Sequence, residues 1–188
     1  MSVLTLANQL TLTRVMLVPA FVILTIYGYF GWALIVFAIA GLTDLLDGLI
    51  ARRFSRHTNL GAWLDPMADK LLIAATVVVL TMPGLGLVNK LPVWLTILMI
   101  SRDLLIVLTV AVINLAIGRR EFRPSIYGKI ATATYMLTCV TIMFFNYMQT
   151  TSGIVTVGIW GSAVITLVSA AHYVANIGKI INAGGQTS

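Results

Sequence analysis

Charged residues, cysteine and linker-like segments are all scarce in this chain. Only 10% of its 188 residues are charged and 59% are hydrophobic, whereas about a quarter of the residues of a soluble domain are charged. The composition therefore excludes an ordinary soluble domain. The single cysteine, Cys139, excludes an internal disulfide framework and a cysteine-rich metal site, and its apolar surroundings predict a buried, inert thiol. No Gly, Ser or Pro stretch is long enough for an interdomain linker, which predicts one domain over residues 1–188.

Long apolar runs are what the chain has in place of charge. A membrane-spanning helix needs about 20 mainly apolar residues. The runs are too long for the tilted strands of a membrane barrel, so we expect an all-α, polytopic membrane bundle. The polar residues before the first run predict a short N-terminal interfacial segment. The six predicted transmembrane helices cover residues 12–29, 31–52, 60–82, 91–117, 125–149 and 153–177.

The positive charges predict the orientation of this bundle. In the loops and at the ends of the spans, one cation, Lys90, falls on one side of the membrane and nine fall on the other. By the positive-inside rule the side with nine is cytoplasmic, and it carries both termini. We therefore expect a multi-pass protein of the cell inner membrane. The net charge of +6 is not gathered in a basic stripe on a polar surface, so no nucleic-acid partner is expected. The nine cations are Arg14, Arg52, Arg53, Arg56, Arg119, Arg120, Arg123, Lys129 and Lys179.

Acidic residues are scarcer still, and most of them lie where a membrane disfavours them. An ionised carboxylate at bilayer depth costs about 2.5–3.5 kcal/mol, so several unpaired ones would offset the stability of a whole domain. Lys70 and Arg102 are the cations that lie away from the span ends, and two cations are too few to neutralise all these acids. For the acid that directly follows Arg102, an ion pair with that arginine and a contact with substrate both stay open. Five of the six acids lie in predicted spans: Asp44, Asp47, Asp65, Asp69 and Asp103.

The spacing of four of these aspartates favours a bound cation. Asp44 and Asp47 lie three residues apart, and Asp65 and Asp69 lie four apart, so each pair shares one helix face. Only the short basic turn 53–60 separates the two spans, which predicts antiparallel neighbours with the pairs at similar depth. Four carboxylates without His or Cys suit a hard divalent cation, Mg²⁺ or Mn²⁺. Two adjacent ions are expected.

The residues around these aspartates resemble a known signature. Residues 44–52 read D-L-L-D-G-L-I-A-R and are followed by Gly61, Asp65 and Asp69. All eight motif positions match the signature of the CDP-alcohol phosphotransferases at the family spacing. Residues 8–14 are also similar to the amino-terminal segment of that family, although Ala7 replaces a frequent proline.

The resemblance implies an activity and a set of site residues. Family members transfer a phosphatidyl or similar group from a CDP-linked donor to an alcohol and release CMP. The resemblance implies a metal centre at Asp44, Asp47, Asp65 and Asp69, with Asp69 also acting as general base on the acceptor hydroxyl. It implies that Gly48, Ala51, Arg52 and Gly61 line the CDP site. The expected donor is CDP-diacylglycerol, held in the membrane with its nucleotide on the cytoplasmic side, and a homodimer is expected because homodimers are common in the family.

The acceptor alcohol is less well defined by the sequence. The commonest bacterial role of this signature is phosphatidylglycerophosphate synthase, which uses glycerol 3-phosphate, and this is our leading prediction. Arg102-Asp103 is more similar to the cardiolipin synthases of the same family, and Ala131 and Tyr135 depart from the glycerophosphate pattern. Cardiolipin synthase, with phosphatidylglycerol as acceptor, is therefore the alternative, ahead of inositol phosphate or serine. A cationic pocket for the acceptor phosphate is expected from Arg102, Arg119, Arg120, Arg123 and Lys129.

A membrane ion transporter is the alternative of another class, because it also places carboxylates within the bilayer. Transporters distribute such residues along a path or between paired repeats. Here four aspartates fall between residues 44 and 69, beside a basic turn. This concentration favours the enzyme.

Overall fold

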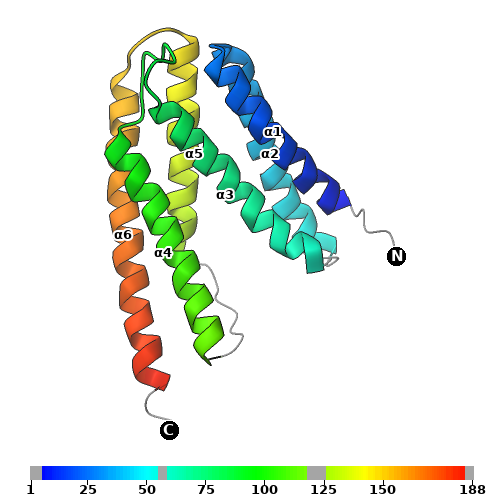
Figure 1. Cartoon of the computed structure of the whole chain (residues 1–188), viewed down its shortest axis with the longest axis vertical. Helices are drawn as coiled ribbons and strands as arrows, with labels where there is room; N and C mark the ends of the chain where they lie inside the picture. Colours follow the sequence, from blue (N-terminus) through cyan, green and yellow to red (C-terminus); the bar gives the residue numbers. More distant parts are fainter. Residues whose placement is uncertain (1–5, 55–58, 118–125, 185–188) are drawn as a thin grey trace. The chain divides into compact units, whose positions relative to one another are not determined.

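The computed structural model describes the backbone of residues 6–54, 59–117 and 126–184, and the side chains of residues 12–43, 70–109 and 126–175. Over these residues the chain forms six helices and no strand (Figure 1). The predicted all-α class is confirmed. The helices are α1 (Leu6–Ile26), α2 (Phe30–Phe54), α3 (Asn59–Thr81), α4 (Val93–Ile117), α5 (Ile126–Tyr147) and α6 (Gly153–Gly184).

Two helices end in the same hydrogen-bonded turn. After α1, the N–H of Tyr29 donates to the carbonyl of Leu24 at 2.9 Å, and Gly28 adopts a φ of 78°. After α5, the N–H of Thr150 donates to the carbonyl of Phe145 at 3.1 Å, and Gln149 adopts a φ of 52°. Such turns satisfy the last carbonyls of a helix and favour glycine at the left-handed position. Gly28 therefore explains why the first two helices are joined by so short a connection.

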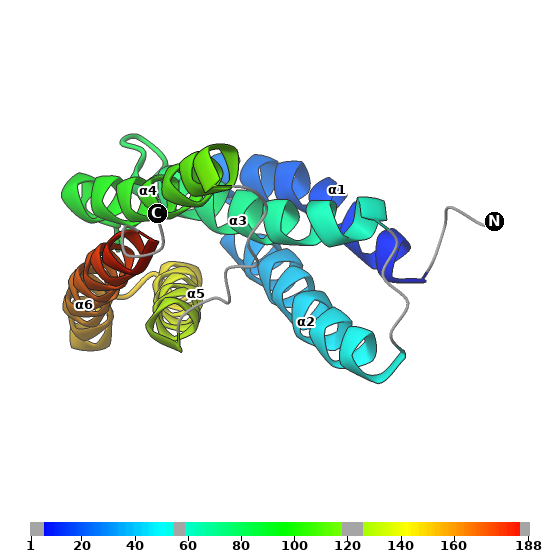
Figure 2. The same cartoon turned by 90° about the horizontal axis from the view of Figure 1, so that it is seen from below.

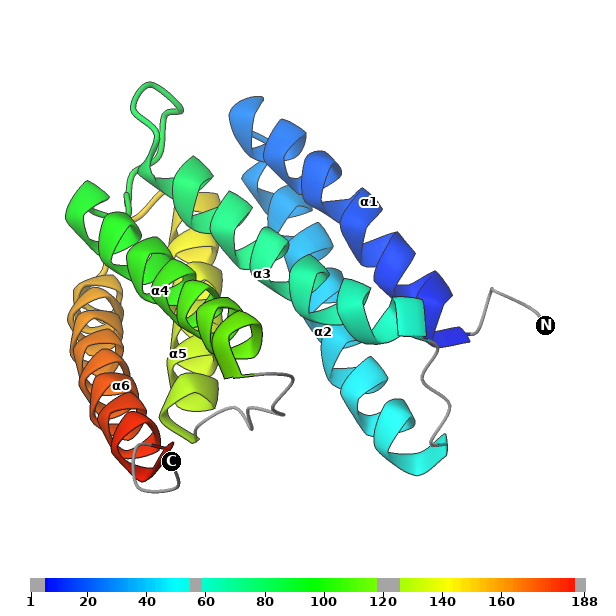
Figure 3. The same ribbon diagram turned by 60° about the horizontal axis from the view of Figure 1, so that its bottom comes forward.

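The chain divides into two compact units, and the first contains the described parts of residues 1–91 and 139–155. In this unit α1 packs against both α2 and α3 (Figure 3). The rings of Phe21 and Phe37 lie 5.6 Å apart, centroid to centroid, in the core between α1 and α2. The side chain of Asn146 holds the segment before α4 in place through two hydrogen bonds. It accepts from the backbone N–H of Asn89 at 2.8 Å and donates to the backbone carbonyl of Asn89 at 2.9 Å.

The second unit contains the described parts of residues 92–138 and 156–188, which supply α4, most of α6 and the first part of α5 (Figure 2). Within it α5 and α6 approach closely where Gly158 faces Thr138. A Cβ atom at Gly158 would lie only 3.1 Å from the Thr138 hydroxyl oxygen. That hydroxyl donates to the Gly158 carbonyl and shares a 2.9 Å hydrogen bond with Ser162. Cys139, which belongs to the first unit, is buried, as predicted.

The outer surface of the described helices is rich in large apolar side chains. Leu137, Val157 and Val174 are each about two-thirds exposed or more, and apolar surface of this extent is typical of a membrane-contacting protein. Among the described side chains, two helical segments are long and apolar enough to cross a membrane, Ile126–Tyr147 and Gly153–Ala175. Shorter apolar segments cover Leu12–Ile26, Phe30–Thr43 and Lys70–Thr81. Six membrane crossings, the interfacial segment and the single domain stay predictions.

Candidate active site

The eight motif positions lie on two helices of the first unit. Asp44, Asp47, Gly48, Ala51 and Arg52 belong to α2, and Gly61, Asp65 and Asp69 belong to α3. The backbone is helical at every one of these positions, as the predicted spans required. Their side chains lie outside the described ones, so the metal ligands, the CDP-site residues and the general base stay predictions.

The register of α2 places its aspartates on the continuation of a buried face. Ala33, Phe37 and Ala40 are all buried in the core of the first unit, at successive spacings of four and three residues. Continued toward the end of α2, the same spacing of four and three residues arrives at Asp44, Asp47 and Ala51. In α3 the same spacing, counted from the buried Thr76 and Leu72 toward the start of the helix, arrives at Asp69 and Asp65. By helical spacing, both aspartate pairs are therefore in register with these buried residues of their own helices.

Arg14 is a residue whose setting the sequence did not reveal. It was assigned to the topology signal and to the amino-terminal segment that resembles the family, yet it is 1% exposed and among the largest fully buried side chains of the described chain. Its face of α1 continues through the buried residues Val18, Phe21 and Thr25. The four-three-four spacing of these residues was the available signal. A guanidinium on the core face of α1, which packs against both aspartate-bearing helices, is suited to hold an anionic group.

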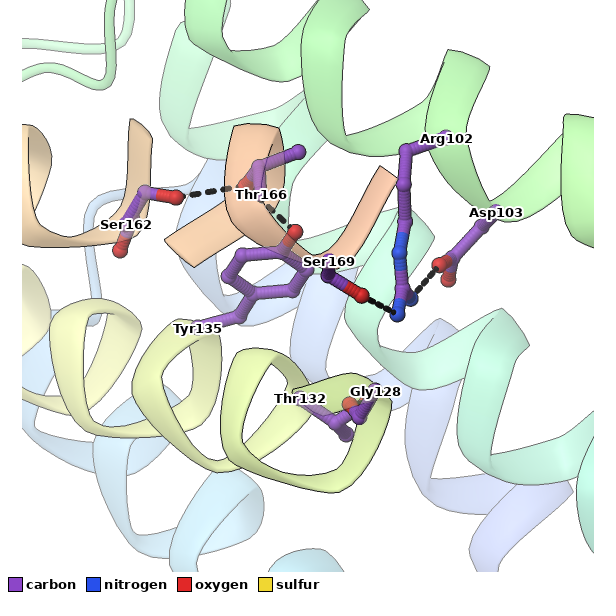
Figure 4. A network of polar contacts seen from close by, with 8 residues as sticks. All are labelled: Arg102, Asp103, Gly128, Thr132, Tyr135, Ser162, Thr166 and Ser169. Carbon is purple, nitrogen blue, oxygen red and sulfur yellow. Dashed lines mark hydrogen bonds and ion pairs between the residues drawn. The ribbon is translucent and has the colours of Figure 1, made fainter. Parts of the chain in front are cut away.

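In the second unit Arg102 is buried and bonded to two partners (Figure 4). Its Nη1 donates to Oδ1 of Asp103 at 2.5 Å, and its Nη2 donates to the hydroxyl oxygen of Ser169 in α6 at 2.6 Å. Of the two readings left open for Asp103, the local ion pair is the one that the structure contains. The Asp103 side chain is 29% exposed, so one side of the pair remains accessible.

Of the five expected acceptor cations, the structure describes the side chains of Arg102 and Lys129. Lys129 lies in the first turn of α5 and is exposed. Arg119, Arg120 and Arg123 lie outside the described residues, so the cationic pocket stays a prediction. The described side chains contain no group of three or more His, Cys, Asp or Glu placed to hold a metal ion.

Further buried hydroxyl groups form hydrogen bonds between α5 and α6, and the sequence analysis did not identify them. Thr166 donates to the Ser162 carbonyl at 2.5 Å, so the hydroxyl of Tyr135, also 2.5 Å from the Thr166 oxygen, is the donor of their shared bond. Tyr135 was noted only as a departure from a family pattern, but it is fully buried and joins α5 to α6. The signal was present in α6, where Ser162, Thr166 and Ser169 recur at helical spacing and are all buried.

A cavity of about 540 Å³ lies at the N-terminal end of α2. It is lined by residues from the segment 28–35 and by Tyr147 and Gln149. Trp32 in this lining precedes Asp44 by twelve residues, about 18 Å along a helix. The cavity is therefore separate from the motif.

Comparison with known proteins agrees with the motif. A relative from Mycobacterium tuberculosis, named probable phosphatidylglycerophosphate synthase, is 39% identical over 131 residues, which cover 65% of this chain and 57% of the relative. The cardiolipin synthase (CMP-forming) of Streptomyces coelicolor is 36% identical over 71% of this chain and 62% of the relative. The CDP-diacylglycerol–glycerol-3-phosphate 3-phosphatidyltransferase of Bacillus subtilis is 29% identical over 89% of this chain and 92% of the relative.

The match thus spans less than two thirds of the length of the first two relatives. The sequence model of the CDP-alcohol phosphatidyltransferase family matches residues 4–170. This range contains all eight motif positions and the Arg102–Ser169 contact. The chain belongs to the CDP-alcohol phosphatidyltransferase family.

Proposed function

We propose that this protein transfers the phosphatidyl group of CDP-diacylglycerol to an alcohol and releases CMP. The observation that carries the proposal is the complete eight-position motif on the helical backbone of α2 and α3, in the register of their buried faces. Relatives named as phosphatidyltransferases and CMP-forming synthases support it. In the reaction a bond forms between the acceptor oxygen and the phosphorus of the phosphatidyl group, and the bond from that phosphorus to CMP breaks.

The donor set at the motif suits a divalent metal centre. Asp44, Asp47, Asp65 and Asp69 offer carboxylate oxygens from two helices, which are the ligands preferred by Mg²⁺ and Mn²⁺. We propose that these four residues hold two such ions. The ions would neutralise the diphosphate and stabilise the charge that develops on the CMP leaving group.

The remaining motif residues have roles that follow from their chemistry. Asp69 accepts the proton of the acceptor hydroxyl as attack proceeds, a task for a carboxylate within hydrogen-bond reach. Gly48 and Gly61 leave room for the nucleotide close to the helix backbone, and Ala51 lines the same site. Arg52 binds an anionic oxygen of the diphosphate.

Glycerol 3-phosphate is the acceptor that we propose first. The relatives from M. tuberculosis and B. subtilis carry names of glycerol-phosphate enzymes. Phosphatidylglycerol is the second candidate, supported by the cardiolipin synthase relatives and by the Arg102–Asp103 pair. The exposed Lys129 and the arginines at 119, 120 and 123 are proposed to bind the acceptor phosphate together with Arg102.

The cellular setting is proposed on the same basis. Apolar helices and relatives that make membrane lipids support a membrane location. We propose six crossings of the inner membrane, a cytoplasmic active site and termini, and a homodimer. The positive-inside distribution of Lys and Arg supports the orientation.

The acceptor is tested by giving the purified full-length chain CDP-diacylglycerol, Mg²⁺ or Mn²⁺, and one acceptor at a time. The acceptors are glycerol 3-phosphate, phosphatidylglycerol, inositol phosphate and serine, with products identified by mass. Phosphatidylglycerophosphate is the expected product. Exclusive formation of cardiolipin would replace the leading acceptor, and no lipid product with any acceptor would reject the transferase and favour a transporter.

A further inference from the structure

The guanidinium of Arg102 is held from two different helices. Asp103 contacts Nη1 from the same helix, α4, and Ser169 accepts a hydrogen bond from Nη2 across the interface with α6. Ser169 is 1% exposed and Arg102 is 6% exposed, so the contact between them is buried, whereas the contact with Asp103 is only partly buried. Figure 4 shows both contacts. Two partners on separate nitrogens fix the plane of the guanidinium as well as its position.

Ser169 is not needed to compensate the positive charge of Arg102. Asp103 already supplies the compensating charge, and a serine hydroxyl adds only a neutral acceptor. Ser169 adds orientation, because an arginine side chain has many rotamers and loses conformational entropy when it is fixed. A guanidinium that is already fixed binds an anionic oxygen at a lower entropic cost.

The held guanidinium keeps donors for a ligand. It carries five N–H groups, of which the two contacts use two. Its Nε is buried and has no hydrogen-bond partner among the described residues. Phosphate oxygens are the acceptors that match the donor fork of arginine.

Ser169 itself stands on a firmly attached part of α6. Thr166, three residues earlier, is bonded to Tyr135 of α5 at 2.5 Å. Tyr173, four residues later, donates to the carbonyl of Ile106 in α4 at 3.2 Å. These hydrogen bonds on both sides hold the helical turn that contains Ser169 against α4 and α5. The Ser169 hydroxyl therefore has a fixed position from which it can orient the Arg102 guanidinium.

We propose that Ser169 is a positioning residue, which orients Arg102 to bind the phosphate of a glycerol-phosphate headgroup. The headgroup belongs either to free glycerol 3-phosphate or to phosphatidylglycerol. The inference rests on the proposed function, since it concerns the acceptor of that reaction. It assigns no catalytic step to Ser169, which acts only through Arg102.

The test compares Ser169→Ala and Ser169→Thr with the unchanged chain, purified at full length in detergent. Initial rates are measured over a range of each acceptor, and separately over a range of CDP-diacylglycerol. Loss of one hydrogen bond to a charged group predicts an acceptor KM raised about tenfold in Ser169→Ala, with the KM for CDP-diacylglycerol unchanged. Ser169→Thr keeps the hydroxyl and is expected to restore the acceptor KM.

Ser162→Ala is the matched control for a merely structural role. Ser162 is also a buried serine of α6, but its hydroxyl bonds to Thr138 and not to Arg102. It is expected to lower the melting temperature as much as Ser169→Ala does and to leave the acceptor KM unchanged. Equal acceptor KM values in the two alanine variants would overturn the inference.

Two further outcomes separate this inference from the function on which it rests. If the unchanged chain uses neither glycerol 3-phosphate nor phosphatidylglycerol, the proposed acceptor class fails, and the inference fails with it. If the unchanged chain is active and Ser169→Ala raises both substrate KM values equally, only the inference fails. Whichever of the two acceptors is used identifies the source of the headgroup.

Discussion

At the scale of single residues, Asp69 bears the most demanding role in the proposed reaction. It is proposed both to hold a metal ion and to accept the proton of the acceptor hydroxyl. The α3 backbone places it one turn after Asp65 and one turn before the buried Ile73. An amide at this position keeps the size of the side chain but removes its basicity.

Asp69→Asn is therefore expected to lower turnover by about 10²–10⁴-fold, the usual contribution of a positioned general base. Binding of CDP-diacylglycerol, measured by equilibrium titration, should remain largely intact, because three other aspartates of the motif remain. Turnover close to that of the unchanged chain would show that the base is another residue.

Some of the site residues could be predicted from the sequence, whereas others could not. The motif aspartates and glycines were identifiable because their spacing is local, within residues 44–69. Ser169 lies 67 positions after Arg102 in the sequence, and a local sequence pattern cannot predict a contact between residues so far apart. Arg14 was assigned to topology because a basic residue near a span end has that role by default, whereas its burial depends on how α1 packs.

At the scale of helices, the apolar runs predicted the existence of all six elements but not their ends. The first run was expected to begin at residue 12, whereas α1 begins at Leu6. Polar residues such as Asn8 and Gln9 interrupt an apolar run without interrupting a helix, because backbone hydrogen bonding does not require apolar side chains. The last helix likewise continues beyond the predicted residue 177 to Gly184.

The contact between α5 and α6 gives a matched pair of glycine substitutions. A Cβ at Gly158 would crowd Thr138, at 3.1 Å from its oxygen and 3.2 Å from its methyl carbon, whereas a Cβ at Gly161 would meet nothing within 4 Å. Gly161→Ala is expected to stabilise the protein by about 0.5–1 kcal/mol through helix propensity. Gly158→Ala is expected to destabilise it by about 1–3 kcal/mol, because Thr138 is held by its own hydrogen bonds.

Thermal unfolding of the two glycine variants in the same detergent measures this difference. Gly161→Ala should have the higher melting temperature and Gly158→Ala the lower one, on either side of the unchanged chain. A Gly158→Ala variant as stable as Gly161→Ala would mean that α5 and α6 do not pack at this point as described.

At the scale of the whole molecule, the few charges and the many apolar residues act together. The low charge content made a membrane bundle the expectation, and the exposed apolar side chains of the described helices agree with it. The division into two units was not foreseen. Each unit combines segments far apart in the chain, such as residues 1–91 with 139–155, and composition does not encode pairings of that kind.

The proposed activity of the whole protein also depends on more than its motif. The helical register at the aspartates and family membership both support phosphatidyl transfer. The metal dependence is central to this proposal, because four carboxylates within predicted membrane spans need compensating charge.

The most direct measurement is release of CMP from CDP-diacylglycerol by the purified full-length chain, with acceptor present. The account predicts that release requires Mg²⁺ or Mn²⁺, stops when EDTA removes the metal, resumes when metal is added back, and is lost in Asp69→Asn. Release that continues undiminished after complete removal of divalent metal, or no release under any of these conditions, would contradict it.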